Sequence, residues 1–204
     1  MDVKTIGVIG AGPAGREIAR AALLGGYRTI LEDVSPGTLE QATAAIEQSL
    51  RDDVTRGRLK RDEVDGALAR FSTARRVDEV CREADLLFET VPEEMEVKLE
   101  IFTIFDKFAK PDAILASSTW LSITEIAAIT FRTENCVGMR FVNRAPQKSL
   151  LEIVRGADSS DATIAACVEI GRRMGLEAVV LREPPEFAVG RDTDAVSRAK
   201  GHAE

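Results

Sequence analysis

The chain has 204 residues, which is enough to bury a sizeable core as one large domain or two small ones. Its 45% hydrophobic and 30% charged residues are typical of a soluble globular protein. A net charge of −7 with a pI near 5.0 leaves no basic stripe, which argues against a nucleic-acid partner.

The sequence also gives expectations about the compartment. No apolar run approaches the roughly 18 residues that a membrane span needs, so we expect no membrane partner. The first residues, MDVKTIGVIGAG, lack a secretory pattern. The cysteines Cys81, Cys136 and Cys167 are too widely spaced for a metal site or a disulfide framework. We therefore expect a cytoplasmic protein without a metal.

Short apolar runs alternate with helical periods along the chain. Gly57 interrupts one long helical stretch, residues 36–70, and so predicts a helical hairpin after the second strand. Strands that alternate with helices predict an α/β fold with a doubly wound, mostly parallel sheet. The other predicted strands are 5–10, 27–34, 84–91, 112–118, 134–142, 149–154 and 176–181, and the other predicted helices are 13–25, 94–109, 122–129 and 160–174. Residues 1–190 are expected to form one domain, and 191–204 a polar tail.

A glycine motif follows the first predicted strand. Gly10, Gly12 and Gly15 form a GxGxxG pattern that opens a helix, and Asp33 ends the next strand. In such a motif the glycines allow a tight turn, a close approach of a pyrophosphate and close helix packing, while the acid binds the adenine-side ribose. The pattern predicts a Rossmann-like domain that binds NAD rather than NADP. An ordinary strand–turn–helix connection and an FAD site are the alternatives.

Further segments carry a family resemblance. FETVPEEMEVKLEIF, ASSTWLSIT, VGMRFVN and LLEIVRG resemble, in this order, the NAD-binding domain of L-3-hydroxyacyl-CoA dehydrogenases, over about residues 3–191. The resemblance implies a Rossmann domain with a helical hairpin after the second strand, followed by a helical domain. It also implies the NAD-dependent conversion of 3-hydroxyacyl-CoA to 3-ketoacyl-CoA in fatty-acid metabolism.

The resemblance assigns binding roles to individual residues. It implies that NAD contacts Glu93, Lys98 and Asn143, in addition to the glycine motif and Asp33. For an acyl-CoA-like substrate it implies contacts with Ser49 and Arg56 on the hairpin and with Ser118. Without the resemblance, Glu93 and Lys98 could equally be a solvated ion pair at a helix start.

The catalytic positions depart from the family pattern. The family uses a histidine as general base and a glutamate that orients it. Glu152 matches the glutamate, but the histidine position is Arg140. Arginine has no acceptor lone pair and stays protonated, so it cannot act as the base. The single histidine, His202, lies in the predicted tail.

Two other substrate-side positions differ as well. The family's N-T-S-S loop is one residue shorter here and becomes Ser118-Thr119-Trp120. The family ending PGFVVNR appears as PEFAVGR, with Glu186 and Gly190 in place of a glycine and an asparagine.

We interpret Arg140 as the ion-pair partner of Glu152. Binding of a ligand carboxylate or phosphate by Arg140 is the alternative.

Three functions remain open at this point. The first is a 3-hydroxyacyl-CoA dehydrogenase that is impaired or specialised, acting as a homo-oligomer or with a separate polypeptide that carries the helical domain. The second is a non-catalytic NAD-binding sensor or interaction module, that is, a pseudoenzyme. The third, a dehydrogenase of the β-hydroxyacid type, is disfavoured because the sequence has neither its glycine-rich substrate loop nor its lysine base.

Overall fold

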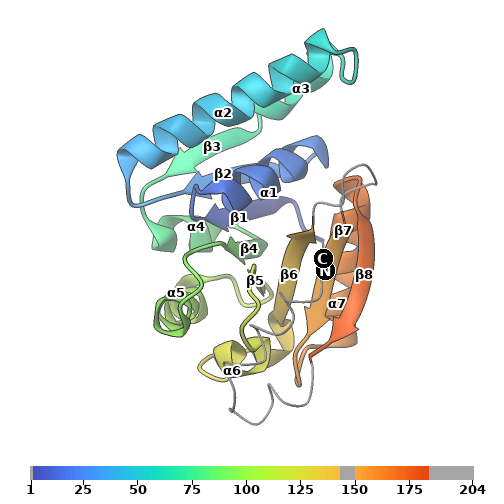
Figure 1. Ribbon diagram of the computed structural model, residues 1–204. Helices are drawn as coiled ribbons and strands as arrows, with labels where there is room; N and C mark the ends of the chain where they lie inside the picture. Colours follow the sequence, from blue (N-terminus) through green and yellow to red (C-terminus); the bar gives the residue numbers. More distant parts are fainter. Residues whose placement is uncertain (1, 143–149, 184–204) are drawn as a thin grey trace, which may run out of the picture.

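A single sheet organises the chain. The computed structural model describes residues 2–142 and 150–183 (Figure 1). Its eight strands have the order β3-β2-β1-β4-β5-β6-β7-β8, and every neighbouring pair is parallel except β6 and β7. The strands are β1 (Thr5–Ile9), β2 (Arg28–Glu32), β3 (Phe71–Ala74), β4 (Leu86–Glu89), β5 (Ile114–Ser117), β6 (Cys136–Val142), β7 (Leu150–Arg155) and β8 (Glu177–Arg182).

Helices cover both faces of this sheet. On one face α1, α2, α3 and α7 pack against strand residues such as Val8 and Leu31, and on the other α4, α5 and α6 pack against residues such as Leu87 and Leu115. The fold is therefore doubly wound, as predicted. The helices are α1 (Pro13–Leu24), α2 (Pro36–Thr55), α3 (Arg61–Leu68), α4 (Val77–Glu83), α5 (Met95–Phe108), α6 (Ile123–Ala127) and α7 (Asp161–Arg173), with a short 3₁₀ helix η1 (Thr133–Asn135).

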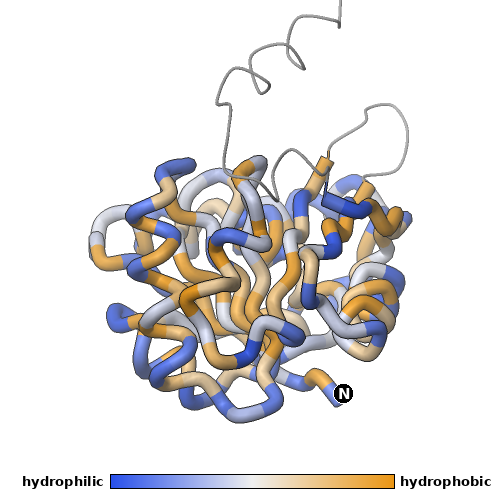
Figure 2. Tube along the Cα trace, turned by 90° about the horizontal axis from the view of Figure 1, so that it is seen from below, coloured by the Kyte–Doolittle hydropathy of each residue, from blue (hydrophilic) through white to orange (hydrophobic). Residues whose placement is uncertain are grey.

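The central strands are buried on both faces, which explains their continuous apolar sequences. All five residues of β1 and all four of β4 are buried. Successive side chains point to opposite faces, so Phe88 joins one hydrophobic layer and Leu87 the other. The strands at the centre of Figure 2 are mainly hydrophobic, and hydrophilic stretches lie on the outer helices and loops.

The predicted helical hairpin is confirmed as α2 and α3. Ser35 caps α2 by accepting a hydrogen bond from the backbone N–H of Thr38 at 3.3 Å. Gly57, at a φ of +68°, makes the turn after α2. The buried carboxylate of Asp53 pairs with Arg20 on α1 and with Nε of Arg58 at 3.0 Å, and thereby joins the hairpin to α1.

Two elements of the α/β layers were not predicted, and neither was η1, which replaces the start of the predicted strand 134–142. Strand β3 and helix α4 are short, and β3 lies at the sheet edge with two exposed and two half-buried residues. Neither has the long apolar pattern that would identify it in the sequence. The domain boundary expected at residue 190 and the polar tail lie outside the described residues. Among the described residues, no helix combines the length and apolar character that crossing a bilayer requires.

One buried carboxyl group opposes the stability of the fold. Glu32, at the end of β2, is 2% exposed, and its Oε1 has no hydrogen-bond partner among the described residues. Burial, with a smaller contribution from the neighbouring Asp33, raises the pKa of Glu32 from 4.5 to about 7. The folded state therefore retains a proton that the unfolded chain loses, and stability falls as the pH rises from about 4.5 to about 7.

The substitution Glu32→Gln should remove this pH dependence. Between about pH 5 and pH 8, the free energy of unfolding of the variant should rise by about 2 to 3 kcal/mol relative to that of the wild type. Urea denaturation at both pH values measures the change. Glu17→Gln, at an exposed position on α1, is the control and should show no relative change. An equal pH response of Glu32→Gln and the wild type would contradict a buried, protonated Glu32.

Candidate functional site

The glycine loop joins β1 to α1 at the carboxyl edge of the sheet. Gly10 has a φ of +98°, and a Cβ there would lie 2.8 Å from Oγ1 of Thr90. A Cβ at Gly15 would lie 1.9 Å from the carbonyl oxygen of Gly10, so only glycine lets α1 pack this close to the strand. A Cβ at Gly12 would meet nothing within 4 Å. The loop thus has two tightly packed glycines and one that faces open space.

The amino terminus of α1 is available to an anion. Gly12 is its N-cap and Pro13 its first residue, and no side chain of the described residues caps it. The first turn contains no acidic residue. Its N–H groups and the positive end of the helix dipole therefore face the open space beside Gly12.

Asp33 lies beside the same loop. Its Oδ2 accepts a hydrogen bond from the N–H of Ala11 and its Oδ1 one from the N–H of Ser35, both at 2.9 Å. The N–H of Gly10 donates to the carbonyl oxygen of Glu32, also at 2.9 Å. Each carboxylate oxygen of Asp33 keeps acceptor capacity, and the side chain is only half-buried. This geometry fits a carboxylate that accepts from ribose hydroxyls.

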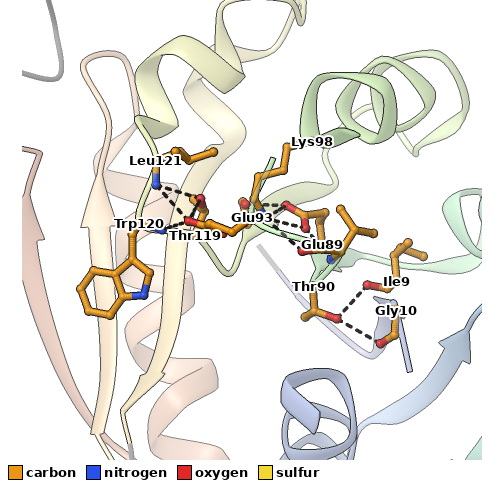
Figure 3. Close-up of polar contacts among 11 residues, drawn as sticks. Ile9, Gly10, Glu89, Thr90, Glu93, Lys98, Thr119, Trp120 and Leu121 are labelled. Atoms are coloured by element: carbon orange, nitrogen blue, oxygen red, sulfur yellow. Dashed lines mark hydrogen bonds and ion pairs between the residues drawn. The ribbon is translucent and has the colours of Figure 1, made fainter. Parts of the chain in front are cut away.

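Thr90 connects the loop to β4. Its Oγ1 lies 2.9 Å from the carbonyl oxygen of Ile9 and 3.0 Å from that of Gly10 (Figure 3). The N–H of Thr90 also donates to the carbonyl of Ile9 at 2.8 Å. Thr90 could not be predicted from the sequence, because its role depends on the parallel pairing of β1 with β4.

A buried ion pair follows at the ends of β4 and β5. Nζ of Lys98 lies 2.9 and 3.2 Å from the carboxylate oxygens of Glu89, and both residues are 0% exposed. Glu89 also accepts from Oγ of Ser117 at 2.5 Å and from the N–H of Val91 at 2.7 Å. Burial raises the pKa of Glu89, while Lys98 and these hydrogen bonds act in the opposite direction. Glu89 and Ser117 were not predicted as site residues, because in the sequence they are only the ends of two strands.

Glu93 links two loops of the carboxyl edge. It accepts from Oγ1 of Thr119 at 2.8 Å and from the N–H of Trp120 at 2.5 Å, and it lies 3.3 Å from Nζ of Lys98 (Figure 3). The alternative of a solvated Glu93–Lys98 pair is wrong for Lys98, which is fully buried. The expected NAD contacts of both residues stay predictions. A contact by Lys98 would require its side chain to move.

Arg140 pairs with Glu152, as predicted. The two residues face each other in the antiparallel ladder of β6 and β7. Nε and Nη2 of Arg140 donate to Oε2 of Glu152 at 3.0 and 2.7 Å, and Nη1 donates to the carbonyl of Thr119 at 3.4 Å. The guanidinium also stacks on Trp120, 3.9 Å from the ring centroid. Arg140 is therefore held on three sides and offers only donors.

The remaining predicted residues are dispersed. Ser118 follows β5, is half-buried, and donates its N–H to the carbonyl of Glu89 at 2.9 Å. Ser49 is half-buried on α2, and Arg56 is exposed at the end of that helix. Asn143 lies outside the described residues, as do Glu186, Gly190 and His202. The expected contacts of Ser49, Arg56 and Ser118 with a CoA-like substrate stay predictions.

Comparison with known proteins places this site in a family. Residues 5–184 match the family "3-hydroxyacyl-CoA dehydrogenase, NAD binding domain". A 3-hydroxybutyryl-CoA dehydrogenase of Bradyrhizobium diazoefficiens is 37% identical over 190 residues, which are 93% of this chain and 64% of the relative. A probable 3-hydroxybutyryl-CoA dehydrogenase of Bacillus subtilis is 34% identical over 192 residues, or 94% of this chain and 67% of the relative.

Solved structures agree with the sequence matches. A crystal structure of (S)-3-hydroxybutyryl-CoA dehydrogenase from Ralstonia eutropha has a TM-score of 0.84 at 30% identity and covers 93% of this chain. One of 3-hydroxybutyryl-CoA dehydrogenase from Escherichia coli has a TM-score of 0.86 at 31% identity and covers 94%. The chain spans 67% and 40% of these two structures, and about two thirds of the two curated relatives.

The fold, the glycine loop and the matches agree with one another. The family match covers most of the chain, and NAD is the cofactor that this family indicates. The resemblance inferred from the sequence is thus confirmed. The chain belongs to the family of NAD-binding domains of 3-hydroxyacyl-CoA dehydrogenases.

Proposed function

We propose that this chain is the coenzyme-binding part of an NAD-dependent oxidoreductase of the 3-hydroxyacyl-CoA type in which proton transfer is impaired. The observation that carries the proposal is the carboxyl edge around Gly12. There, open space, an uncapped helix start and the Asp33 carboxylate lie together in a domain of this family.

The residues present fit the coenzyme. The pyrophosphate would lie against the first turn of α1 at Gly12, and the adenine-side ribose would bind Asp33. The nicotinamide half would extend across β4 toward the loop after β5, which Glu93 holds in place. NAD held by these residues would supply the hydride-transfer chemistry of a dehydrogenase.

The residues at β6 lack the proton acceptor that a dehydrogenation requires. Removal of a hydroxyl proton requires an acceptor, and Arg140 has none. Glu152, which would orient a histidine, instead accepts two hydrogen bonds from Arg140. The loss of a positioned acid–base group costs about 10²- to 10⁴-fold in rate. Turnover by this chain is therefore reduced to that extent or more.

A second function is favoured by the same contacts. Arg140 is occupied by Glu152, Thr119 and Trp120, an arrangement that is complete without a substrate. This supports a non-catalytic NAD-binding sensor or interaction module. Only the oxidoreductase would need a substrate, which we propose to be an acyl-CoA bound near Ser49, Arg56 and Ser118. A homo-oligomer or a separate helical polypeptide as partner, and a cytoplasmic location, are compatible with both.

Turnover separates the two functions. Oxidation of NADH with acetoacetyl-CoA, clearly above the rate without protein, alone or after addition of a family helical domain, supports the oxidoreductase. Saturable NAD binding without turnover under both conditions supports the binding module.

Gly12→Ala tests the coenzyme site itself. The backbone of Gly12 has a φ of −67°, which alanine adopts freely, and the new methyl group meets no protein atom within 4 Å. The fold should therefore persist, while the methyl group occupies the space for the pyrophosphate. Calorimetry should show NAD affinity at least about 10-fold weaker, or about 1.4 kcal/mol. Gly37→Ala, also in open space, is the matched control and should bind like the wild type. Unchanged affinity in Gly12→Ala would exclude this site.

Asp33→Asn should relax the choice between NAD and NADP. The substitution removes the charge that repels a 2′-phosphate. In the β2–β3 ladder, Glu32 pairs with Ala74, and the residues that follow these two are Asp33 and the exposed Arg75. The positive charge of Arg75 therefore lies at the same carboxyl edge as Asp33. NAD affinity should fall, and the ratio of NADP to NAD affinity should rise about 10-fold. An unchanged ratio would contradict the ribose contact.

Arg140→His tests whether the missing base alone limits turnover. Imidazole can accept a proton, and Glu152 would be free to orient it. Acetoacetyl-CoA reduction should then rise about 10²-fold or more above the wild type. Arg140→Gln, which removes the charge without supplying a base, is the control. If both variants stay inactive while NAD binding persists, the non-catalytic function is favoured.

A further inference from the structure

Trp120 is a large aromatic side chain that the protein leaves open to solvent. It is 56% exposed and is the single tryptophan of the chain. An indole ring carries one of the largest apolar surfaces of any side chain, so an exposed indole can bury a large apolar area when a ligand binds. Tryptophan is also among the residues that contribute most often to binding energy at interfaces.

The loop that carries Trp120 is fixed. The N–H of Trp120 and that of Leu121 donate to Oε1 of Glu93 at 2.5 and 3.3 Å, and the Thr119 hydroxyl donates to the same oxygen at 2.8 Å. Glu93 in turn lies 3.3 Å from the buried Lys98. The position of the backbone at Trp120 is thus set by the core of the β4–α5 region.

The orientation of the ring is fixed as well. Arg140 lies over the ring, 3.9 Å from its centroid, and Glu152 holds Arg140 from the neighbouring strand. The side chains of Arg140 and Glu152 are only 16% and 15% exposed. One face of the indole is therefore occupied by a fixed partner, and the exposed surface includes the opposite face.

Trp120 lies on the part of the carboxyl edge toward which the second half of a dinucleotide anchored at Gly12 would extend. It follows β5 by three residues, and β5 is separated from β1 by β4 alone. Adjacent strands are about 4.8 Å apart, so the β5 loop is about 10 Å along the edge from the glycine loop. Glu93 and Thr90 lie between the two, as Figure 3 shows.

We propose that the free face of Trp120 is the stacking surface for the nicotinamide ring of the bound dinucleotide. The proposal rests on the proposed function, because it needs the pyrophosphate at Gly12 to direct the nicotinamide half toward β5. The ligand class is a planar, electron-poor heteroaromatic ring, which stacks favourably on indole. Arg140 acts here as a positioning residue, which fixes the plane of the indole.

The experiment compares two ligands that differ in the nicotinamide end. NAD⁺ and ADP-ribose share the adenosine and pyrophosphate, but only NAD⁺ carries the ring. In the full chain, NAD⁺ should quench the fluorescence of Trp120 by contact, whereas ADP-ribose should bind in calorimetry and leave the emission unchanged. Equal emission with saturating NAD⁺ and ADP-ribose would overturn the proposal.

Variants supply a second readout. Trp120→Ala should weaken NAD⁺ binding about 10-fold, as expected for the loss of one stacking contact, and leave ADP-ribose binding unchanged. Trp120→Phe should restore most of the NAD⁺ affinity. Phe131→Ala, at a 98% exposed aromatic residue before β6, is the control and should affect neither ligand.

The outcomes distinguish this inference from the proposed function. If Trp120→Ala binds NAD⁺ as tightly as the wild type does, the stacking contact is excluded and the coenzyme site stands. If the wild type binds neither NAD⁺ nor ADP-ribose, the proposed function fails, and the stacking proposal fails with it.

Discussion

The close approach of α1 to β1 is the constraint on which the rest of the site depends. At Gly15 the helix touches the carbonyl of Gly10 so closely that no side chain fits between them. This contact aims the first turn of α1 along the carboxyl edge of the sheet, at the point between the parallel strands β1 and β4 where the strand order reverses. A helix start placed there can accept a pyrophosphate without any charged side chain.

The same edge carries polar groups on one face of the sheet. Their neighbours along the strands pack against α1, α2, α3 and α7 on the opposite face. The polar residues therefore project from the face that α4, α5 and α6 cover; they are Glu32, Glu89, Ser117, Arg140 and Glu152. The two charge pairs among them are matched and hydrogen-bonded, whereas Glu32 is not. At this edge a charged side chain can be buried where it has an ion-pair and hydrogen-bond partner. The protein thus keeps charge beside the proposed coenzyme without exposing most of it to water.

Much of the fold was predictable, because the buried parallel strands have distinct apolar runs and the glycine motif has a fixed relation to Asp33. The short β3 and α4 were missed because they lack such patterns. At the site, the Arg140–Glu152 pair was predictable from charge matching at the positions that the resemblance assigns. The buried state of Lys98, the role of Thr90 and the stacking of Trp120 on Arg140 were not predictable. Each depends on how loops from different strands meet in space.

The central claim is that a dinucleotide binds along this edge, anchored at Gly12 and Asp33. A crystal structure of the chain grown with millimolar NADH tests it most directly. The account predicts the pyrophosphate within hydrogen-bonding distance of the first-turn N–H groups of α1 and a ribose hydroxyl on the Asp33 carboxylate. A dinucleotide bound elsewhere, or an empty edge at saturating coenzyme, would contradict it.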